Sequence, residues 1–204
     1  MPTILSHPAV PLALGVGFGP KAVPRPLLIA GIVASALPDL DVIAFRLGIP
    51  YSAALGHRGF SHSLGLAAVV ALGGAWALRK ALRKARSPLP AAFGFLFLSM
   101  ASHGLLDAFT TGGRGIALLW PFTEQRFFWP LQVIRVSPLS LSKLLSLRGQ
   151  TVLLSEALWV WLPSTALALG LWTLRRGRLL PVGPRLDPTR PSLPSPPDQP
   201  RGNP

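Results

Sequence analysis

The sequence predicts an all-α fold: a polytopic membrane helix bundle of about four to five transmembrane helices, with loop elements covering one end. Three observations support this prediction. The 204 residues are 50% hydrophobic and only 13% charged, with a mean hydropathy of +0.45, which is too apolar for a soluble domain of this length. The apolar residues gather in long runs, and the Lys and Arg residues lie in short clusters between these runs.

Five apolar runs are candidate helices, because about 20 apolar residues in a helix cross the hydrocarbon layer. The runs at 62–78, 90–109 and 153–174 are nearly continuous and contain small residues that permit close helix packing. The runs at 7–20 and 26–37 are shorter and interrupted by proline. We therefore expect the first two to form short helices or a helical hairpin that only partly crosses the membrane.

The basic clusters predict the orientation, since cytoplasmic loops near helix ends are enriched in Lys and Arg. The three clusters are Lys21 with Arg25, the segment 79–86, and Arg175 with Arg176 and Arg178. Five crossings place all three on the cytoplasmic side and the N-terminus outside. The segment 110–152 is then outside as well, although it contains basic residues of its own, so the inverted orientation stays open.

Composition also limits the domains and the chemistry. Residues 1–176 are predicted to form the transmembrane domain, and residues 177–204 a disordered, Pro-rich cytoplasmic tail with too few apolar residues to pack. The absence of cysteine excludes disulfides, thiolate zinc sites and cysteine nucleophiles. The net charge of +13 forms no stripe with interleaved aromatic residues, so we expect no nucleic-acid partner, and no oligomeric state is predicted.

Ionisable residues are rare in and beside the apolar runs. Placing such groups in a membrane costs free energy, so those that occur there are usually functional. The chain has only four histidines and seven acidic residues. Three of the five acids outside the tail fall in two motifs, LPDLD at 37–41 and HGLLD at 103–107. His103 and Asp107 lie four residues apart, so both project from one helix face. LPDLD closes the second apolar run and is expected to hold its two carboxylates close together.

The motif HRGFSHS precedes the third apolar run. His57 and His62 flank a turn, and Ser61 is expected to cap the helix that follows. The predicted topology brings the polar groups of all these motifs to one end of the bundle in either orientation. These groups are His7, Asp39, Asp41, His57, His62, His103 and Asp107.

Imidazole and carboxylate ligands predict a divalent metal, with zinc favoured for hydrolysis. The candidate ligands are more numerous than the four positions of one tetrahedral site, so we expect one or two ions. Asp39 is then expected to bridge the ions, and Asp41 either to bind metal or to orient a histidine. Asp41 and Asp107 are candidate general bases. Arg58 and Arg114 are candidate anion clamps, because guanidinium matches phosphate geometry. The alternative for both arginines is a headgroup contact or a simple loop charge.

The segments LPDLD, HRGFSHS, HGLLDAFTTGG and LLWPF, in this order after an early histidine, resemble the YdjM/YbcI-like family of bacterial inner-membrane proteins described as metal-dependent hydrolases. The resemblance covers residues 5–125. It implies that the metal ligands are His7, Asp39, His57, His62, His103 and Asp107, with Asp41 and Arg58 close by. The family commonly has Thr in place of Ser61, and this departure keeps the hydroxyl. The ligand order is also loosely similar to that of zinc-dependent bacterial phospholipase C.

The leading functional hypothesis is a membrane-bound, metal-dependent hydrolase. It would act on a phosphoester or other ester of a membrane lipid or of a lipid-like or phosphorylated small substrate. We expect a multi-pass protein of the inner membrane with its metal site on the extracytoplasmic face. One alternative is a non-catalytic regulatory or stress protein with a structural metal site. Another is a metal or proton transporter. The predicted ligands lie at one end of the bundle, whereas transport sites usually lie near the bilayer midplane, which disfavours this alternative.

Two further segments carry minor predictions. The aromatic stretch 120–130 is expected to form an interfacial belt or a re-entrant loop instead of a substrate box. Glu156 is expected to begin the last helix and to interact there with the helix dipole.

Overall fold

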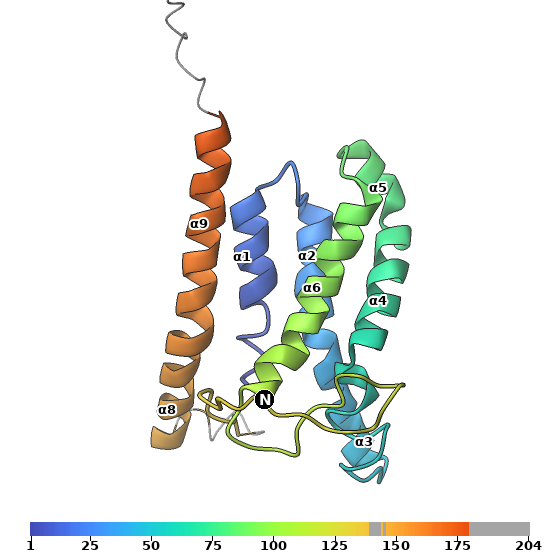
Figure 1. Cartoon of the computed structure of the whole chain (residues 1–204), viewed down its shortest axis with the longest axis vertical. Coiled ribbons are helices and arrows are strands. Elements are labelled where there is room, and N and C mark those ends of the chain that lie inside the picture. Colours follow the sequence, from blue (N-terminus) through green and yellow to red (C-terminus); the bar gives the residue numbers. More distant parts are fainter. Residues whose placement is uncertain (139–143, 145, 180–204) are drawn as a thin grey trace, which may run out of the picture.

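The computed structural model describes residues 1–138, 144 and 146–179, and this part of the chain is helical, with two isolated bridges and no strand (Figure 1). The elements in chain order are α1 (Ala9–Phe18), α2 (Arg25–Ala36), the 3₁₀ helix η1 (Leu37–Val42), α3 (Ile43–Arg46), the 3₁₀ helix η2 (Phe60–His62), α4 (Leu64–Ala77), α5 (Arg79–Lys84), α6 (Leu89–Ala108), α8 (Leu147–Glu156), the π-helical segment η3 (Ala157–Trp161) and α9 (Leu162–Leu179). The prediction of an all-α fold is confirmed.

Three helical stretches of the described chain are long and apolar enough to cross a membrane: Arg25–Arg46, Leu89–Ala108 and Leu147–Gly177. The helices α1 and α4 are apolar but shorter, with 10 and 14 residues. At a rise of about 1.5 Å per residue they extend over roughly 15 to 20 Å, less than the hydrocarbon thickness. The bundle therefore combines three spanning stretches with two shorter apolar helices, in agreement with the predicted membrane helix bundle. Two of the five runs differ from expectation. The run 26–37 is long enough to cross, because η1 and α3 extend α2 to Arg46, whereas the run 62–78 forms a helix of only 14 residues.

The helix α6 lies between α2 and α4, and α9 runs along α1 (Figure 1). Small residues make these close contacts possible. A Cβ atom on Gly31 of α2 would lie 2.4 Å from the ring of Phe95 on α6. A Cβ atom on Gly17 of α1 would lie 2.6 Å from the Cβ of Leu171 on α9. Side chains larger than hydrogen are excluded at both positions, as is typical of packed membrane helices.

The basic clusters and the histidine motifs lie at opposite ends of the bundle. The turn between α1 and α2, the helix α5 and the end of α9 are at one end, and the loops 47–59 and 109–138 are at the other (Figure 1). The sequence predicts that all basic clusters lie at one end of the bundle and all histidine motifs at the other, and the structure agrees. The basic segment 79–86 forms the short helix α5. Which side of the membrane each end faces stays a prediction.

Loops cover the end of the bundle that carries the histidines. Within residues 109–138, Ile116 and Phe127 exchange two backbone hydrogen bonds of 3.0 and 2.9 Å. The Arg126 guanidinium donates to the carbonyl oxygens of His57 and Tyr51, each at 2.9 Å, and so ties one loop to the other. The aromatic stretch 120–130 belongs to this cover, and its role as an interfacial belt stays a prediction.

Two local predictions are wrong. Glu156 does not begin the last helix, because α8 begins at Leu147 and Glu156 is its buried last residue. The cap of α4 is Ser63, whose hydroxyl oxygen accepts the Leu66 N–H at 3.1 Å, since the Ser61 hydroxyl is used elsewhere. Helix α9 also extends into the predicted tail, and residues 180–204 of that tail lie outside the described residues.

Candidate metal centre

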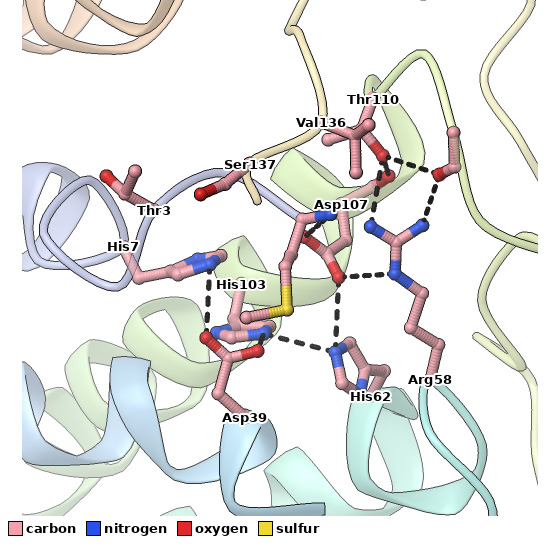
Figure 2. Close-up of polar contacts among 12 residues, drawn as sticks. Thr3, His7, Asp39, Arg58, His62, His103, Asp107, Thr110, Val136 and Ser137 are labelled. Carbon is pink, nitrogen blue, oxygen red and sulfur yellow. Dashed lines mark hydrogen bonds and ion pairs between the residues drawn. The ribbon is translucent and has the colours of Figure 1, made fainter. Parts of the chain in front are cut away.

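The four histidines and three of the aspartates of the chain lie together under the loop cover. Figure 2 shows the side chains of His7, Asp39, His62, His103 and Asp107 pointing toward one another from four separate segments. All five are buried, with at most 5% of their surface exposed. Asp41 adjoins this group through His62, and His57 adjoins Asp41.

Local backbone geometry aims the two aspartates of LPDLD in different directions. Pro38 lies at the start of η1, where the α-helix gives way to a 3₁₀ helix. Successive residues of a 3₁₀ helix are rotated by about 120°, so side chains two positions apart do not share a face. Asp39 therefore points to His7 and His103, whereas Asp41 points to His57.

Asp39 joins two histidines. One carboxylate oxygen lies 3.7 Å from His7 Nε2 and the other lies 3.4 Å from His103 Nε2. The two imidazole rings are stacked, with centroids 3.6 Å apart. His103 Nδ1 lies 2.7 Å from the carbonyl oxygen of Ser35, to which it donates, so the lone pair is on Nε2. A backbone carbonyl thus orients this ring, as is common for metal-binding histidines.

His62 and Asp107 complete the group. His62 Nε2 lies 3.1 Å from His103 Nε2 and 3.3 Å from a carboxylate oxygen of Asp107. Ligand atoms of His7, His103 and Asp107 lie within 4.8 Å of one another, and so do those of Asp39, His62 and His103. Such spacing approaches that of atoms bound at about 2.0–2.2 Å to a shared ion. His103 belongs to both sets, so the geometry accommodates one or two ions.

Several of these atoms are buried and have no hydrogen-bond partner in the described part of the chain. They are both ring nitrogens of His7 and both carboxylate oxygens of Asp39 and of Asp107. Burying carboxylates without hydrogen-bond partners is costly, and buried charges are normally paired or bound to metal. Asp107 has partial compensation from the Arg58 Nε at 2.9 Å. Asp39 has none comparable, so the donor set fits a divalent cation.

The pKa values of His7 and His62, which lie outside the membrane-spanning stretches, are shifted in opposite directions. Burial, and then the neighbouring His103, hold the pKa of His7 well below its usual value, so its ring is neutral. Burial alone lowers the pKa of His62, but the hydrogen bonds to Asp107 and Asp41 outweigh it and raise that pKa to about 9. Because neutral imidazole is the form that binds metal, His62 has to release a proton when an ion binds.

Asp41 is the centre of a second, fully hydrogen-bonded group. One of its oxygens accepts a hydrogen bond from His57 Nδ1 at 2.5 Å. The other accepts from the Ser61 hydroxyl at 2.5 Å and from the Arg58 N–H at 3.0 Å, and it lies 3.3 Å from His62 Nδ1. The structure therefore places His57 beside Asp41 and outside both sets of clustered ligand atoms. His57 lines a cavity of about 230 Å³ at the loop side of the site.

The Arg58 side chain turns into the protein and is 1% exposed. Its guanidinium contacts Asp107, donates to the carbonyl oxygen of Gly112 at 2.8 Å and donates to the Thr110 hydroxyl at 3.1 Å. Gly113, at φ +100°, leaves room for this group, because a Cβ there would lie 2.4 Å from Arg58 Nη1. Arg58 thus braces Asp107 while it also lines the 230 Å³ cavity.

Arg114 lies at the rim of the site. Its side chain is exposed, and the guanidinium carbon is 5.8 Å from the centre of the Tyr51 ring. Tyr51 lines the same cavity as His57 and Arg58. Arg114 is therefore near the cavity but outside the buried group of ligands.

The sequence interpretation missed the part that Glu156 plays in this end of the bundle. One carboxylate oxygen of Glu156 accepts the Thr3 N–H at 2.5 Å, and the other accepts the hydroxyls of Thr3 and Ser6, each at 2.6 Å. These bonds fix the segment that carries His7. The signal was available, since Glu156 is the only acid in the last apolar region, and a lone buried acid requires partners.

Comparisons with known proteins agree with the resemblance seen in the motifs. A family model described as YdjM inner membrane protein matches residues 1–178. Inner membrane protein YbcI of Escherichia coli (strain K12) is 47% identical over 176 residues, which are 86% of this chain and 100% of the relative. No solved structure matches significantly. Together with the apolar helices, these matches indicate a multi-pass protein of the inner membrane. The chain belongs to the YdjM family of inner membrane proteins.

Proposed function

We propose that this protein is a membrane-bound, metal-dependent hydrolase that cleaves a phosphoester or ester bond of a lipid-like substrate. The observation that carries the proposal is the group of buried ligand atoms without hydrogen-bond partners on His7, Asp39 and Asp107. Such a group is unfavourable in a protein interior unless a cation binds there. The ligands in this proposal are His7, Asp39, His62, His103 and Asp107, and the metal is one or two divalent ions, with zinc as the first choice.

The ligand set has the properties of a catalytic zinc site. Zinc bound there would polarise a phosphoryl or carbonyl oxygen and make water more acidic. Asp39 contacts two histidines through different oxygens, which suits a bridging ligand if two ions bind. The Ser35 carbonyl fixes the tautomer of His103, and Arg58 fixes the position of Asp107.

The pair formed by Asp41 and His57 supplies proton transfer in this proposal. Since Asp41 holds Nδ1 of His57, the nitrogen left to exchange a proton is Nε2. His57 lines the 230 Å³ cavity, so a group bound in that cavity has access to the ring. Asp41 acts as a positioning residue here, because its oxygens are already engaged by His57, Ser61 and Arg58.

Charge and location suggest the kind of substrate. Arg58 and Arg114 lie at the cavity and its rim, where guanidinium groups favour an anionic group such as a phosphate. The centre lies at the end of the stretches Arg25–Arg46 and Leu89–Ala108, which are apolar enough to span a membrane. A substrate with a polar head and an apolar tail suits this location.

The proposal is tested on the full chain purified in detergent. Bound metal is measured by elemental analysis, and turnover of long-chain phospholipids and of phosphomonoesters is measured before and after chelation. We expect stoichiometric zinc, turnover that is lost with a chelator, and recovery when zinc is restored. Metal-free protein, or turnover that a chelator leaves unchanged, would contradict the proposal. The exposed variant Glu124→Gln serves as a control for handling and should behave like the unmodified protein.

One observation favours a second candidate, a non-catalytic regulatory protein with a structural metal. The side chains of His7, His103 and Asp107 are fully buried, at 0% exposure, and they join α6 to the segment before α1, which is distant from it in the sequence. A metal bound by such residues would hold the bundle end together. The same measurements separate the two candidates, because a structural site would bind metal and stabilise the fold without any turnover.

A further inference from the structure

An apolar groove of about 510 Å³ lies on the flank of the bundle beside the metal centre. Its walls come from η1 and α3 on one side and from α4 on the other, with α6 behind them. The main apolar lining residues are Leu40, Ile43, Ala44, Leu66, Val70 and Met100. The groove is therefore a cleft between helices at the same end of the bundle as the histidines.

The groove adjoins polar groups of the site. Asp41 and Ser61 belong to its lining, and they are hydrogen-bonded to each other at 2.5 Å. Asp41 is also bonded to His57, which lines the smaller 230 Å³ cavity. The hydrogen bond between Asp41 and His57 thus links a lining residue of the apolar groove to a lining residue of the polar cavity. A molecule that occupied both spaces would need an apolar part and a polar part.

The surroundings of the groove are apolar and face outward. Leu40, Ile43 and Leu47 are 57%, 52% and 70% exposed. The first two lie in the stretch Arg25–Arg46, which is long and apolar enough to span a membrane. Exposed apolar side chains on a stretch that can span a membrane suit contact with hydrocarbon chains, which favours an opening of the groove toward the bilayer.

A second apolar groove provides a comparison within the same molecule. It lies between α1 and α9, has a volume of about 260 Å³ and is lined by residues that include Leu12, Val16 and Leu169. No ionisable side chain of the described chain is among its lining residues. This groove fits ordinary lipid packing, whereas the larger groove has two polar groups of the site, Asp41 and Ser61, in its lining.

We propose that the 510 Å³ groove binds one hydrocarbon chain of an amphiphile whose polar head then enters the cavity lined by His57 and Arg58. That this amphiphile is a substrate rests on the proposed hydrolase function, but the binding of its chain does not. The groove is a specificity site, because it selects molecules with a long apolar chain over soluble phosphoesters.

The binding test uses the full-length protein in detergent and phosphatidic acid that carries a photoreactive diazirine on its acyl chain. After irradiation, labelled peptides are identified by mass spectrometry. We expect the label mainly on the segments 40–47 and 66–70. Ile43→Trp, which fills the groove from an exposed position, should reduce this labelling by about tenfold. Val16→Trp is the matched control in the other groove, with 57% exposure against 52% for Ile43, and should leave the labelling unchanged.

A second variant, Val70→Trp, fills the same groove from α4 and replaces Ile43→Trp if that protein does not fold. Equal labelling of both grooves, or labelling that neither tryptophan variant reduces, would overturn the inference. Labelling is independent of catalysis, so the two proposals can fail separately. Groove labelling without any turnover would leave the chain-binding site standing and refute the hydrolase.

If turnover is present, the groove also predicts its selectivity. Ile43→Trp should lower the turnover of a long-chain phospholipid by about tenfold. Turnover of a soluble short-chain phosphoester should stay unchanged, since that molecule places nothing in the groove. An equal loss for both substrates would show that the variant damages the metal centre, and would contradict a role of the groove in specificity.

Discussion

Asp39 and Asp41 belong to one five-residue motif, yet their surroundings are opposite. Both oxygens of Asp39 are buried without a hydrogen-bond partner in the described chain, and the nearest groups are two histidine nitrogens at 3.4 and 3.7 Å. Both oxygens of Asp41 accept hydrogen bonds, from His57, Ser61 and Arg58. A buried carboxylate by itself therefore does not indicate a metal ligand. The carboxylate that still lacks partners is the one that requires a cation.

The largest expected effect follows from changing these two aspartates in the same way. Asp39→Asn keeps the shape of the side chain but removes the charge, and we expect it to lower metal affinity by more than about 100-fold and to abolish turnover. Asp41→Asn should lower metal affinity by no more than about 10–100-fold, as is usual for groups that only orient a ligand. Metal content after dialysis checks both values. Equal losses in the two variants would refute the distinction between them.

His103 and His57 are expected to differ in the same way as Asp39 and Asp41. His103→Ala removes a residue shared by both ligand sets and should remove metal and turnover together. His57→Ala should keep the metal but lower turnover by about 10²–10⁴-fold, the usual contribution of a positioned acid or base. Metal analysis and initial rates on the same samples check this split. Loss of metal in His57→Ala would assign His57 as a ligand, as the family resemblance implies.

Much of the bundle could be predicted from the sequence, because long apolar runs and basic clusters report directly on membrane crossing. The five runs correspond to α1, α2, α4, α6 and the stretch of α8, η3 and α9. The spacing of His103 and Asp107 also predicts that the two side chains lie on one helix face. One helical turn separates them, and no long-range contact is needed to place them on the same face.

The finer roles depended on geometry that residue types do not reveal. The pattern LPDLD predicts neighbouring carboxylates, but η1 is a 3₁₀ helix and rotates Asp41 away from Asp39. The sequence predicts Ser61 as a helix cap, but its hydroxyl donates to Asp41 and Ser63 caps α4 instead. The sequence predicts that Glu156 begins the last helix, because the apolar run starts at residue 153. The helix in fact begins at Leu147, with polar residues in its first turns.

Removing the metal should have a smaller effect, on stability. An ion that binds only the folded protein adds about 2.7 kcal/mol at a concentration 100 times its Kd. A chelator should therefore lower the Tm of the unmodified protein, and zinc should restore it. Asp41→Asn should still show a metal-dependent Tm, whereas Asp39→Asn should show none. A metal-dependent Tm in Asp39→Asn would indicate that the ion binds elsewhere.

The smallest expected effect concerns Glu156, a buried carboxylate that resembles Asp41 more than Asp39. Three hydrogen bonds from Thr3 and Ser6 satisfy its oxygens, so the comparison predicts that it needs no cation. Glu156→Gln should lower the free energy of unfolding by about 1.5–3 kcal/mol, the contribution of hydrogen bonds to a charged group, while metal content stays unchanged. Chemical denaturation and metal analysis check the two quantities, with the exposed Glu124→Gln as the matched control. A loss of metal in Glu156→Gln would show that fixing the segment before His7 is itself a requirement for the site.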